Sequence, residues 1–185
     1  MHTRIESIEG RKIYVIDQVF TQDEIEAFHE YVSGLSFRKM ERSTSYDEFP
    51  IFSADFVPEK FETDSYVGVK ARELFNNFIE NAGSFKLSRA YINLSNYGDV
   101  EYPHFDCSAE REDITVLYYV NKSWHYKFGG ETIFYSNKDS RIGILPAPGR
   151  FVIFPGNIEH LGSIATRVCR QPRLSLALKY FRTSN

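Results

Sequence analysis

The sequence predicts an α+β fold, with helices early in the chain and strands late. With 185 residues, the chain has the size of one domain with a single sizeable core. Aromatic residues make up 16% of it, and their flat side chains favour the pleated walls of β-sheets. After Lys86, short β-type runs alternate with Gly, Pro, Asn and Asp, which is typical of a sandwich or barrel. We therefore expect one domain spanning 1–185. Its jelly-roll core, a double-stranded β-helix, would occupy about 86–182, braced by helical support at about 1–85.

Two helices are expected ahead of the jelly roll. The β-branched run KIYVIDQVF at 12–20 predicts an opening strand, and Thr21 with Glu24 then forms a capping-box pattern that starts the first helix. Residues 36–60 are expected to form loops with a short strand. The second helix is predicted within SYVGVKARELFNNFIENAG. The expected inward residues are Ile25, Phe28 and Val32 in the first helix and Val69, Leu74, Phe75, Phe78 and Ile79 in the second, with Gly34 and Gly83 as the ends.

Five β-type runs are expected to build the jelly roll. They are FKLSRAYINLSNYG, DITVLYYVN, GGETIFYS, GRFVIFPG and RLSLALKYF.

Composition excludes several classes of partner. The net charge of -3 provides no global attraction to nucleic acid or acidic lipid. No apolar run is long enough to span a bilayer, and MHTRIESIEGRK lacks the apolar core of a secretory signal. Cys107 and Cys169 are the two cysteines, and neither belongs to a CxxC pair. We therefore expect a cytoplasmic protein with neither nucleic acid nor membrane as a partner.

The stretch YPHFDCSA places His104 and Asp106 two residues apart. Side chains at this spacing share one face of a strand, so both can point at one metal ion. Such a pair alone is a weak signal, since it could be a chance pair on a solvated strand end. His160 follows the apolar run RFVIFPG, where a jelly roll can bring it beside the pair. The three residues then form a facial triad of two histidines and one carboxylate, whose open positions suit iron(II).

Each of these histidines also has a plainer interpretation. His160 alone would fit a surface or capping histidine. The remaining histidines, His2, His29 and His125, lie in a terminus, on a helix and in a polar loop, and none has a comparable setting.

Arg173 opens the apolar run RLSLALKYF, and Ser175 shares its face. A guanidinium at the mouth of an apolar barrel is costly unless it holds an anion, and its planar fork matches a carboxylate. Alone, Arg173 could equally be a surface residue that pairs with an acid. Together with the triad, it predicts an anion site.

These motifs in this order resemble the iron(II)- and 2-oxoglutarate-dependent dioxygenases, with the closest likeness to the prolyl-4-hydroxylase-like branch. The likeness covers roughly 88–181 and includes the HxD pair, WHYKFGGETIFYS, LPAPGRFVIFPGNIEH and RLSLALKY. The opening YVIDQVFTQDEIEAF resembles the entry strand and helix of that branch. The resemblance implies a hydroxylase that uses Fe(II), 2-oxoglutarate and dioxygen and releases succinate and carbon dioxide.

Residue by residue, the resemblance makes His104, Asp106 and His160 the iron ligands and the catalytic centre. Arg173 would hold the distal carboxylate of 2-oxoglutarate with help from Ser175. Tyr91 resembles a tyrosine that often hydrogen-bonds the same carboxylate, and Asn93 shares its face. Thr132 and Trp124 are expected at the pocket wall, with packing or rim as the alternative for Trp124. In the GGET segment, Gly129 and Gly130 are expected to serve a tight turn or a close backbone approach.

Two departures weaken the assumption that the substrate is peptidyl proline. Animal collagen-type members often carry Lys at the position of Arg173, and Ser95 stands where a tyrosine is usual. The substrate class therefore stays open between a small molecule and a peptidyl residue, with the polar segments 36–60 and 107–113 as possible cavity mouth. Asp106 favours hydroxylation, because related halogenases lack this carboxylate. Two other classes also remain open: a cupin-like jelly-roll metalloenzyme that does not use 2-oxoglutarate, and a non-catalytic binding module.

Overall fold

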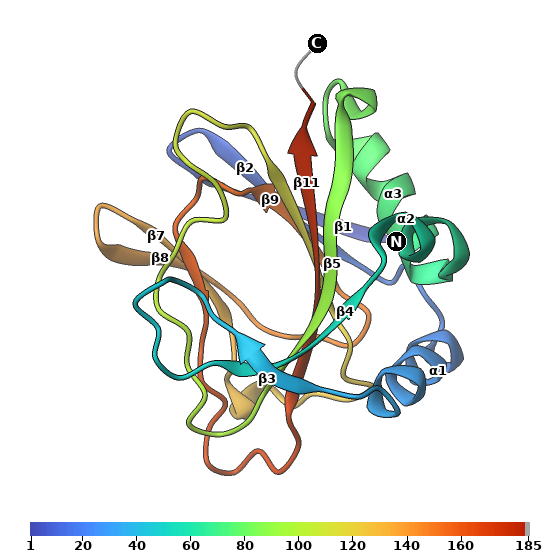
Figure 1. Ribbon diagram of the computed structural model, residues 1–185, viewed down its shortest axis with the longest axis vertical. Coiled ribbons are helices and arrows are strands. Elements are labelled where there is room, and N and C mark those ends of the chain that lie inside the picture. The colour runs from blue at the N-terminus through green and yellow to red at the C-terminus, as the bar shows by residue number, and fades with distance from the viewer. Residues whose placement is uncertain (184–185) are drawn as a thin grey trace.

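The computed structural model describes residues 1–183, which form two antiparallel β-sheets and three α-helices (Figure 1). The large sheet has eight strands in the order β1-β2-β9-β6-β11-β5-β4-β3, and the small sheet has three in the order β10-β7-β8. The helices are α1 (Gln22–Ser33), α2 (Pro58–Asp64) and α3 (Tyr66–Phe78), with short 3-10 turns η1 (Ala82–Ser84) and η2 (Tyr126–Phe128). The strands are β1 (His2–Ile8), β2 (Arg11–Asp17), β3 (Arg38–Glu41), β4 (Ile51–Phe56), β5 (Phe85–Ser95), β6 (Ile114–Tyr119), β7 (Thr132–Ser136), β8 (Asp139–Ile144), β9 (Phe151–Pro155), β10 (His160–Gly162) and β11 (Arg173–Arg182).

The two sheets confirm the predicted α+β class and the double-stranded β-helix. The three helices gather on one side of the large sheet, and the hairpin of β7 and β8 lies on the other (Figure 1). Among the described residues, no helix combines the length and the apolar character needed to cross a membrane.

Helix α1 follows its predicted pattern. Thr21 Oγ1 accepts a hydrogen bond from the Glu24 backbone N–H at 3.3 Å, and the Glu24 carboxylate accepts one from the Thr21 N–H at 2.7 Å. The expected inward residues of this helix are all buried, and Gly34 is the C-cap.

Helix α3 differs from its prediction in both its buried face and its end. Val69 is 49% exposed, whereas Val67, Gly68 and Ala71 are buried. The reason is the close approach of α2: a β-carbon on Gly68 would lie 2.0 Å from the Phe61 carbonyl oxygen. The face next to α2 must therefore contain the glycine, which turns Val69 outward. The helix also ends at Phe78, well before the expected Gly83.

The first 85 residues contribute more strand than predicted. The opening strand and one short strand within 36–60 were expected. The structure adds β1 and a second strand within 36–60, and β1 and β3 form the two edges of the large sheet. Strands β8 and β10 were also not expected. Pairing with neighbouring strands stabilises these short or polar segments, and their own sequences carry little β-type pattern.

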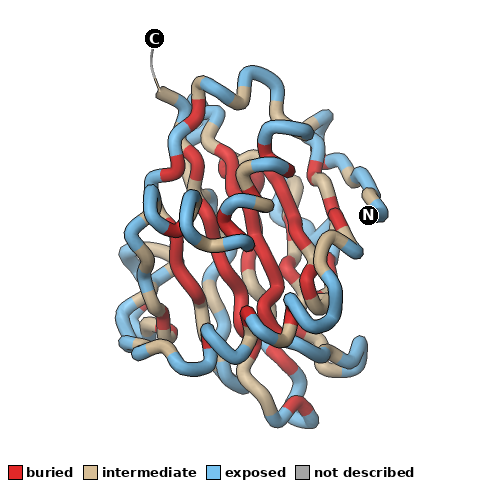
Figure 2. The backbone as a smooth tube through the Cα atoms, turned by 90° about the vertical axis from the view of Figure 1, so that its right-hand side faces the viewer, coloured by how far each residue is buried: buried red, intermediate tan, exposed pale blue. Residues whose placement is uncertain are grey.

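The side chains of strand β11 alternate between the two faces of the large sheet. Leu174, Leu176 and Leu178 belong to the core between the sheet and the helices. The alternate residues face the other way, toward the small sheet, because side chains alternate along a strand. Figure 2 shows the buried stretches running along neighbouring strands through the middle of the molecule. Strand β11 therefore contributes Arg173, Ser175 and Lys179 to the side of this sheet that faces the small sheet, and the small sheet carries His160 on β10.

Candidate functional site

The segment that contains His104 and Asp106 pairs with the chain just before and at β10. His104 forms an isolated antiparallel bridge with His160, and the Asp106 N–H donates a hydrogen bond to the Gly156 carbonyl at 2.8 Å. The prediction placed the HxD pair on the face of a strand, but the structure gives it only this single bridge. The bridge still brings residues that are far apart in the sequence to one point.

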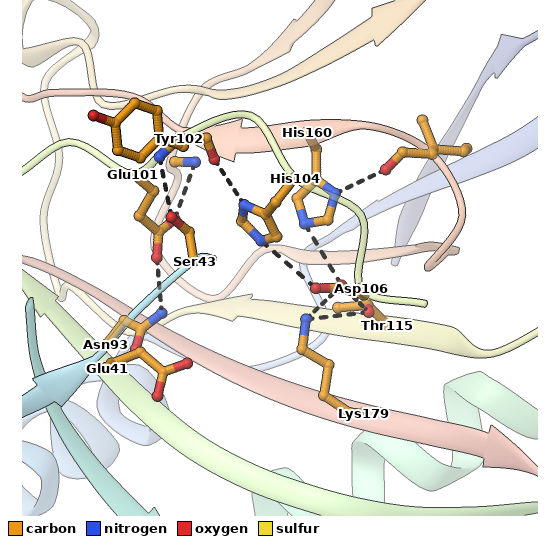
Figure 3. A network of polar contacts seen from close by, with 12 residues as sticks. Glu41, Ser43, Asn93, Glu101, Tyr102, His104, Asp106, Thr115, His160 and Lys179 are labelled. Carbon is orange, nitrogen blue, oxygen red and sulfur yellow. Dashed lines mark hydrogen bonds and ion pairs between the residues drawn. The ribbon is translucent and has the colours of Figure 1, made fainter. Parts of the chain in front are cut away.

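His104, Asp106 and His160 are brought together as predicted. One potential ligand atom from each lies within 4.8 Å of the others. Nε2 of His104 is 3.6 Å from Asp106 Oδ1, and Nε2 of His160 is 3.5 Å from Asp106 Oδ2 (Figure 3). Two imidazole nitrogens and one carboxylate at this mutual distance are the donor set of the facial triad of non-haem iron(II) sites. The donor set therefore fits the metal that the sequence predicts.

Hydrogen bonds to the backbone orient both imidazole rings. His104 Nδ1 lies 2.9 Å from the Tyr102 carbonyl oxygen, and His160 Nδ1 lies 2.9 Å from that of Ile158. A carbonyl can only accept, so Nδ1 carries a proton in each ring, and Nε2 is the ring nitrogen left to bind a metal. This second contact of each ring is the usual support of a metal-binding histidine.

Asp106 is held at one of its two carboxylate oxygens. Thr115 donates a hydrogen bond to Oδ2, and the Lys179 ammonium forms an ion pair with the same atom (Figure 3). Burial alone would raise the pKa of Asp106, but Lys179, His160 and the hydrogen bonds from Lys179 and Thr115 lower it well below its usual range. Asp106 is therefore an anion that can bind a cation through Oδ1.

Burial also decides the protonation state of His160. Desolvation lowers the pKa of this ring to about 4, although the charge of Asp106 acts in the opposite direction. The imidazole is thus neutral at pH 7, which is the form that binds a metal.

A cavity of about 360 Å³ extends from the triad into the space between the sheets. Strand β11 contributes the four alternate residues of its inner face: Arg173, Ser175, Ala177 and Lys179. The other residues around this cavity are Glu41, Arg42, Ser43, Ser88, Arg89, Tyr91, Asn93, Glu101, Phe105, Thr115, Leu117, Thr132, Phe154 and Gly162, besides the triad. Its volume and mixed lining suit a small organic ligand.

Arg173 lies in this cavity as a buried cation. The residue is only 4% exposed, and its guanidinium donates hydrogen bonds to the Gly130 carbonyl at 2.8 Å, Ser175 Oγ at 3.1 Å and Thr132 Oγ1 at 3.0 Å. All three acceptors are neutral. Within the described chain, Arg173 has no carboxylate at ion-pair distance. A buried charge without a counter-ion is costly, so this geometry calls for an anion in the cavity.

The glycines of the GGET segment allow the chain to pass close to Arg173. Gly129 and Gly130 have φ angles of +66° and +75°, which favour glycine. A β-carbon on Gly130 would lie 3.3 Å from Arg173 Cδ and 3.2 Å from Trp124. The expected close backbone approach is therefore present, and the approaching group is the guanidinium side chain.

Tyr91 and Asn93 both line the cavity from β5. The Arg89 guanidinium carbon lies 3.8 Å from the centre of the Tyr91 ring, and Glu41 holds this arginine through two hydrogen bonds. Burial raises the pKa of Tyr91 well above its usual value, so its hydroxyl stays protonated. Asn93 Nδ2 is 3.5 Å from the Glu101 carboxylate, while its buried Oδ1 has no hydrogen-bond partner among residues 1–183.

Two expectations about the wall and the mouth of the cavity are revised. Thr132 does line the cavity, but Trp124 does not: its indole N–H donates to the Gly129 carbonyl at 3.0 Å, and it packs behind the glycines. Of the polar segment 36–60, residues 41–43 reach the cavity, whereas Cys107 belongs to an adjoining cavity of about 420 Å³.

Sequence reasoning missed Thr115 and Lys179, two cavity residues that make polar contacts with the triad. Lys179 continues the alternate face that Arg173 and Ser175 begin, so strand periodicity could have found it. Thr115 offers no such signal, because its partner depends on how β6 sits beside the HxD segment.

Comparisons with known proteins agree with this geometry. Residues 92–181 match the model of the 2OG-Fe(II) oxygenase superfamily. No curated protein sequence matches the chain. Among solved structures, a prolyl hydroxylase from Trichoplax adhaerens, in complex with a peptide of the hypoxia inducible factor oxygen degradation domain, has 19% identity and a TM-score of 0.69, covering 92% of this chain and 83% of that one.

Two further solved structures share the fold. The viral collagen prolyl hydroxylase of Paramecium Bursaria Chlorella virus-1, in its 2OG complex, has 18% identity and a TM-score of 0.63, with coverage of 93% and 96%. A non-heme alpha-ketoglutarate-dependent epimerase from nogalamycin biosynthesis has 12% identity and a TM-score of 0.65, with coverage of 92% and 78%. At these identities the likeness concerns the fold, which two prolyl hydroxylases and an epimerase share.

Proposed function

Because this chain belongs to the 2OG-Fe(II) oxygenase superfamily and is a 2-oxoglutarate-dependent dioxygenase, we propose that it hydroxylates an unactivated C–H bond of a small molecule or a peptidyl residue. In this reaction one oxygen atom of dioxygen enters the new C–OH group and the other enters succinate, while 2-oxoglutarate loses carbon dioxide. The whole described chain would act as one catalytic domain.

In this proposal, His104, Asp106 and His160 hold the iron. Each offers one ligand atom, and the Nδ1 contacts of the two histidines orient their rings so that Nε2 can bind the metal. When bound, the metal together with 2-oxoglutarate supplies the oxidising chemistry, which no side chain of the protein can provide. The protein contributes the ligand geometry, the anion site and the cavity between the sheets.

The observation that carries the 2-oxoglutarate assignment is the unpaired charge of Arg173. Its guanidinium is buried beside neutral hydrogen-bond acceptors, at the end of the cavity that the triad also lines. A ligand that reaches both must carry a carboxylate at one end and metal-binding oxygens at the other, as 2-oxoglutarate does. We assign its distal carboxylate to Arg173, with Ser175 beside it.

The remaining cavity residues have supporting roles in the proposal. The protonated Tyr91 hydroxyl can donate a hydrogen bond to the same carboxylate, and Thr132 fixes the guanidinium through Oγ1. The buried Oδ1 of Asn93 accepts no hydrogen bond from the described chain, so a ligand hydroxyl or a water can donate one to it. Trp124 has no contact with the ligand in this arrangement.

The substrate would enter past Glu41, Arg42 and Ser43, where the cavity meets the surface. The structural neighbours support either class of substrate, since one was solved with a peptide and another belongs to nogalamycin biosynthesis. A polar, charged entrance is compatible with a polar small molecule or with an exposed loop of a polypeptide.

Anaerobic titration tests the cofactor part of this proposal. Addition of Fe(II) and then 2-oxoglutarate to the protein should produce the weak visible charge-transfer band of a chelated complex. His160→Ala should lose the band, and His125→Ala, which removes an exposed histidine outside the site, should retain it. Absence of the band in the unmodified protein would refute the use of 2-oxoglutarate and leave the cupin-like alternative.

Screening for the substrate tests the reaction itself. Candidate amino acids, peptides and natural-product intermediates are incubated with Fe(II), 2-oxoglutarate and oxygen, and succinate is measured together with the mass of the candidate. A gain of one oxygen atom coupled to succinate supports hydroxylation. Succinate with loss of two hydrogen atoms from the candidate would replace hydroxylation by desaturation or ring closure.

A further inference from the structure

Lys179 lines the cavity, and its ammonium group forms an ion pair with Asp106 of the triad. It lies on the inner face of β11, three alternate positions beyond Arg173, and its Nζ contacts Asp106 Oδ2 and lies 3.3 Å from Thr115 Oγ1 (Figure 3). The strand register places Lys179 opposite Thr115 on β6 and opposite Arg89 on β5. Its position is therefore set by pairing on both sides of β11, next to an irregularity in the register with β5 between Lys179 and Tyr180.

The arginines around the cavity do not pair with Asp106. Arg89 is paired with Glu41 and Asp55, and Arg173 donates to the oxygen atoms of Gly130, Ser175 and Thr132. Arg42, which also lines the cavity, is exposed. His160 is neutral at pH 7. Within the described chain, Lys179 is the only residue with a fixed positive charge at ion-pair distance from Asp106.

The two contacts of Oδ2 have different physical consequences. The Thr115 hydroxyl orients the carboxylate and carries no net charge. The Lys179 ammonium orients it as well, but also compensates its negative charge when no metal is bound. A buried carboxylate without such a cation would be much less stable in the metal-free protein. With Lys179 in place, the metal-free site is nearly balanced, and an incoming metal ion meets a positive charge beside its ligand.

We propose that Lys179 sets the charge of the metal site: it serves as the internal counter-ion of Asp106, weakens the binding of the metal cation and strengthens the binding of the anionic cosubstrate. This inference rests on the proposed function, because it assumes that Asp106 is a metal ligand and that 2-oxoglutarate binds beside it. Lys179 is thus a positioning residue that acts through Asp106, and it leaves Oδ1 free for the metal.

The proposal predicts opposite effects for the two residues that hold Oδ2. Lys179→Met removes the positive charge, so Mn(II), used alone as a redox-inert probe, should bind about tenfold more tightly, as expected for one unit charge a few ångströms away in a partly buried site. Titrated into the Mn(II)-loaded protein, 2-oxoglutarate should bind about tenfold more weakly for the same reason. Thr115→Val removes orientation only and should weaken Mn(II) binding.

Isothermal titration calorimetry on the full chain measures these constants. Lys179→Arg keeps the charge and should restore both affinities to within a few-fold of the unmodified protein. Lys86→Met is the matched control, since Lys86 is exposed on the neighbouring strand β5, and it should change neither constant. If Lys179→Met fails to fold, Lys179→Gln removes the charge while keeping a hydrogen-bond donor toward Asp106.

Each outcome is decisive. Tighter metal binding and weaker 2-oxoglutarate binding in the neutral variants support the proposal, because loss of a merely structural side chain would weaken metal binding. Unchanged or weaker Mn(II) affinity in those variants overturns it. Failure of the unmodified protein to bind Mn(II) refutes instead the metal site on which the proposed function depends, so the two failures are distinguishable.

Discussion

His104 and His160 exchange two backbone hydrogen bonds, each 2.9 Å long, across an isolated antiparallel bridge. Their imidazole centres lie 4.7 Å apart. Two residues on opposite strands of such a bridge have side chains on the same face, so the backbone itself aims both rings at one point. The two imidazole rings therefore need little reorganisation to bind one metal ion.

Removal of one ring should destroy this site without destroying the fold. In His160→Ala, the loss of a direct ligand should weaken Mn(II) binding by more than the roughly hundredfold seen when only a supporting contact is lost. Calorimetric titration of Mn(II) measures the effect. His125→Ala should bind Mn(II) as the unmodified protein does, and retention of affinity in His160→Ala would contradict the ligand assignment.

Truncation of Arg173 should affect 2-oxoglutarate and leave the metal alone. A charge-assisted hydrogen bond contributes about 1.5–3 kcal/mol, so Arg173→Ala should raise the dissociation constant of 2-oxoglutarate at least tenfold. Arg173→Lys should have a dissociation constant for 2-oxoglutarate between those of the unmodified protein and Arg173→Ala, because an ammonium keeps the charge but lacks the planar fork. Calorimetry on the Mn(II)-loaded protein gives the constants. Arg141→Ala, at an exposed arginine, is the control, and unchanged 2-oxoglutarate affinity in Arg173→Ala would show that the anion binds elsewhere.

The triad was predictable from sequence because each part has a local signal. A histidine and an aspartate two residues apart share one direction, and His160 follows a strongly apolar strand. Arg173 and Ser175 were predictable for a similar reason, since alternation along β11 places them on one face. The contacts of Asp106 with Thr115 and Lys179 were missed, because they join segments whose relative register only the folded sheets define.

The error in α3 has the same origin. The apolar periodicity around Val69 is real, but the close crossing of α2 at Gly68 decides which face is buried. Similarly, β1, β3 and β8 are stabilised by their partner strands, and their own residues are largely polar and exposed. Local pattern is a good guide where burial is strong, and a poor one where a neighbouring element provides the stabilisation.

The crossing of α2 and α3 leads to a stability prediction. In Gly68→Ala, the new methyl group would lie 2.0 Å from the Phe61 carbonyl oxygen, so the two helices must separate. Overpacking of this kind costs about 1–3 kcal/mol of unfolding free energy. Urea denaturation followed by circular dichroism measures it. Gly83→Ala is the matched control, because no atom lies within 4 Å of the added carbon, and equal stability of the two variants would contradict the close crossing.

Glu101 should oppose the binding of 2-oxoglutarate. Its Oε2 and Arg173 Nη1 lie 3.0 Å and 3.5 Å from the position of a β-carbon on Gly162, so the two charged groups approach the same region of the cavity. The contacts of Glu101 with Asn93 and with the Gly162 N–H are long, at 3.5 Å and 3.3 Å, and neither partner is charged. A bound dianion would therefore be repelled by Glu101 while it pairs with Arg173.

In Glu101→Gln, we expect 2-oxoglutarate to bind the Mn(II)-loaded protein several-fold more tightly, with little change in Mn(II) affinity, because the amide keeps the shape and removes the charge. Glu48→Gln, at an exposed position outside the cavity, is the control for the change in net charge. The salt dependence of the affinity distinguishes a local effect from one of net charge. A gain in 2-oxoglutarate affinity that comes from removing the nearby Glu101 charge should persist at high salt better than a gain from long-range attraction. Weaker 2-oxoglutarate binding in Glu101→Gln would mean that the carboxylate supports the anion site through Asn93 and Gly162, and the inferred repulsion would be wrong.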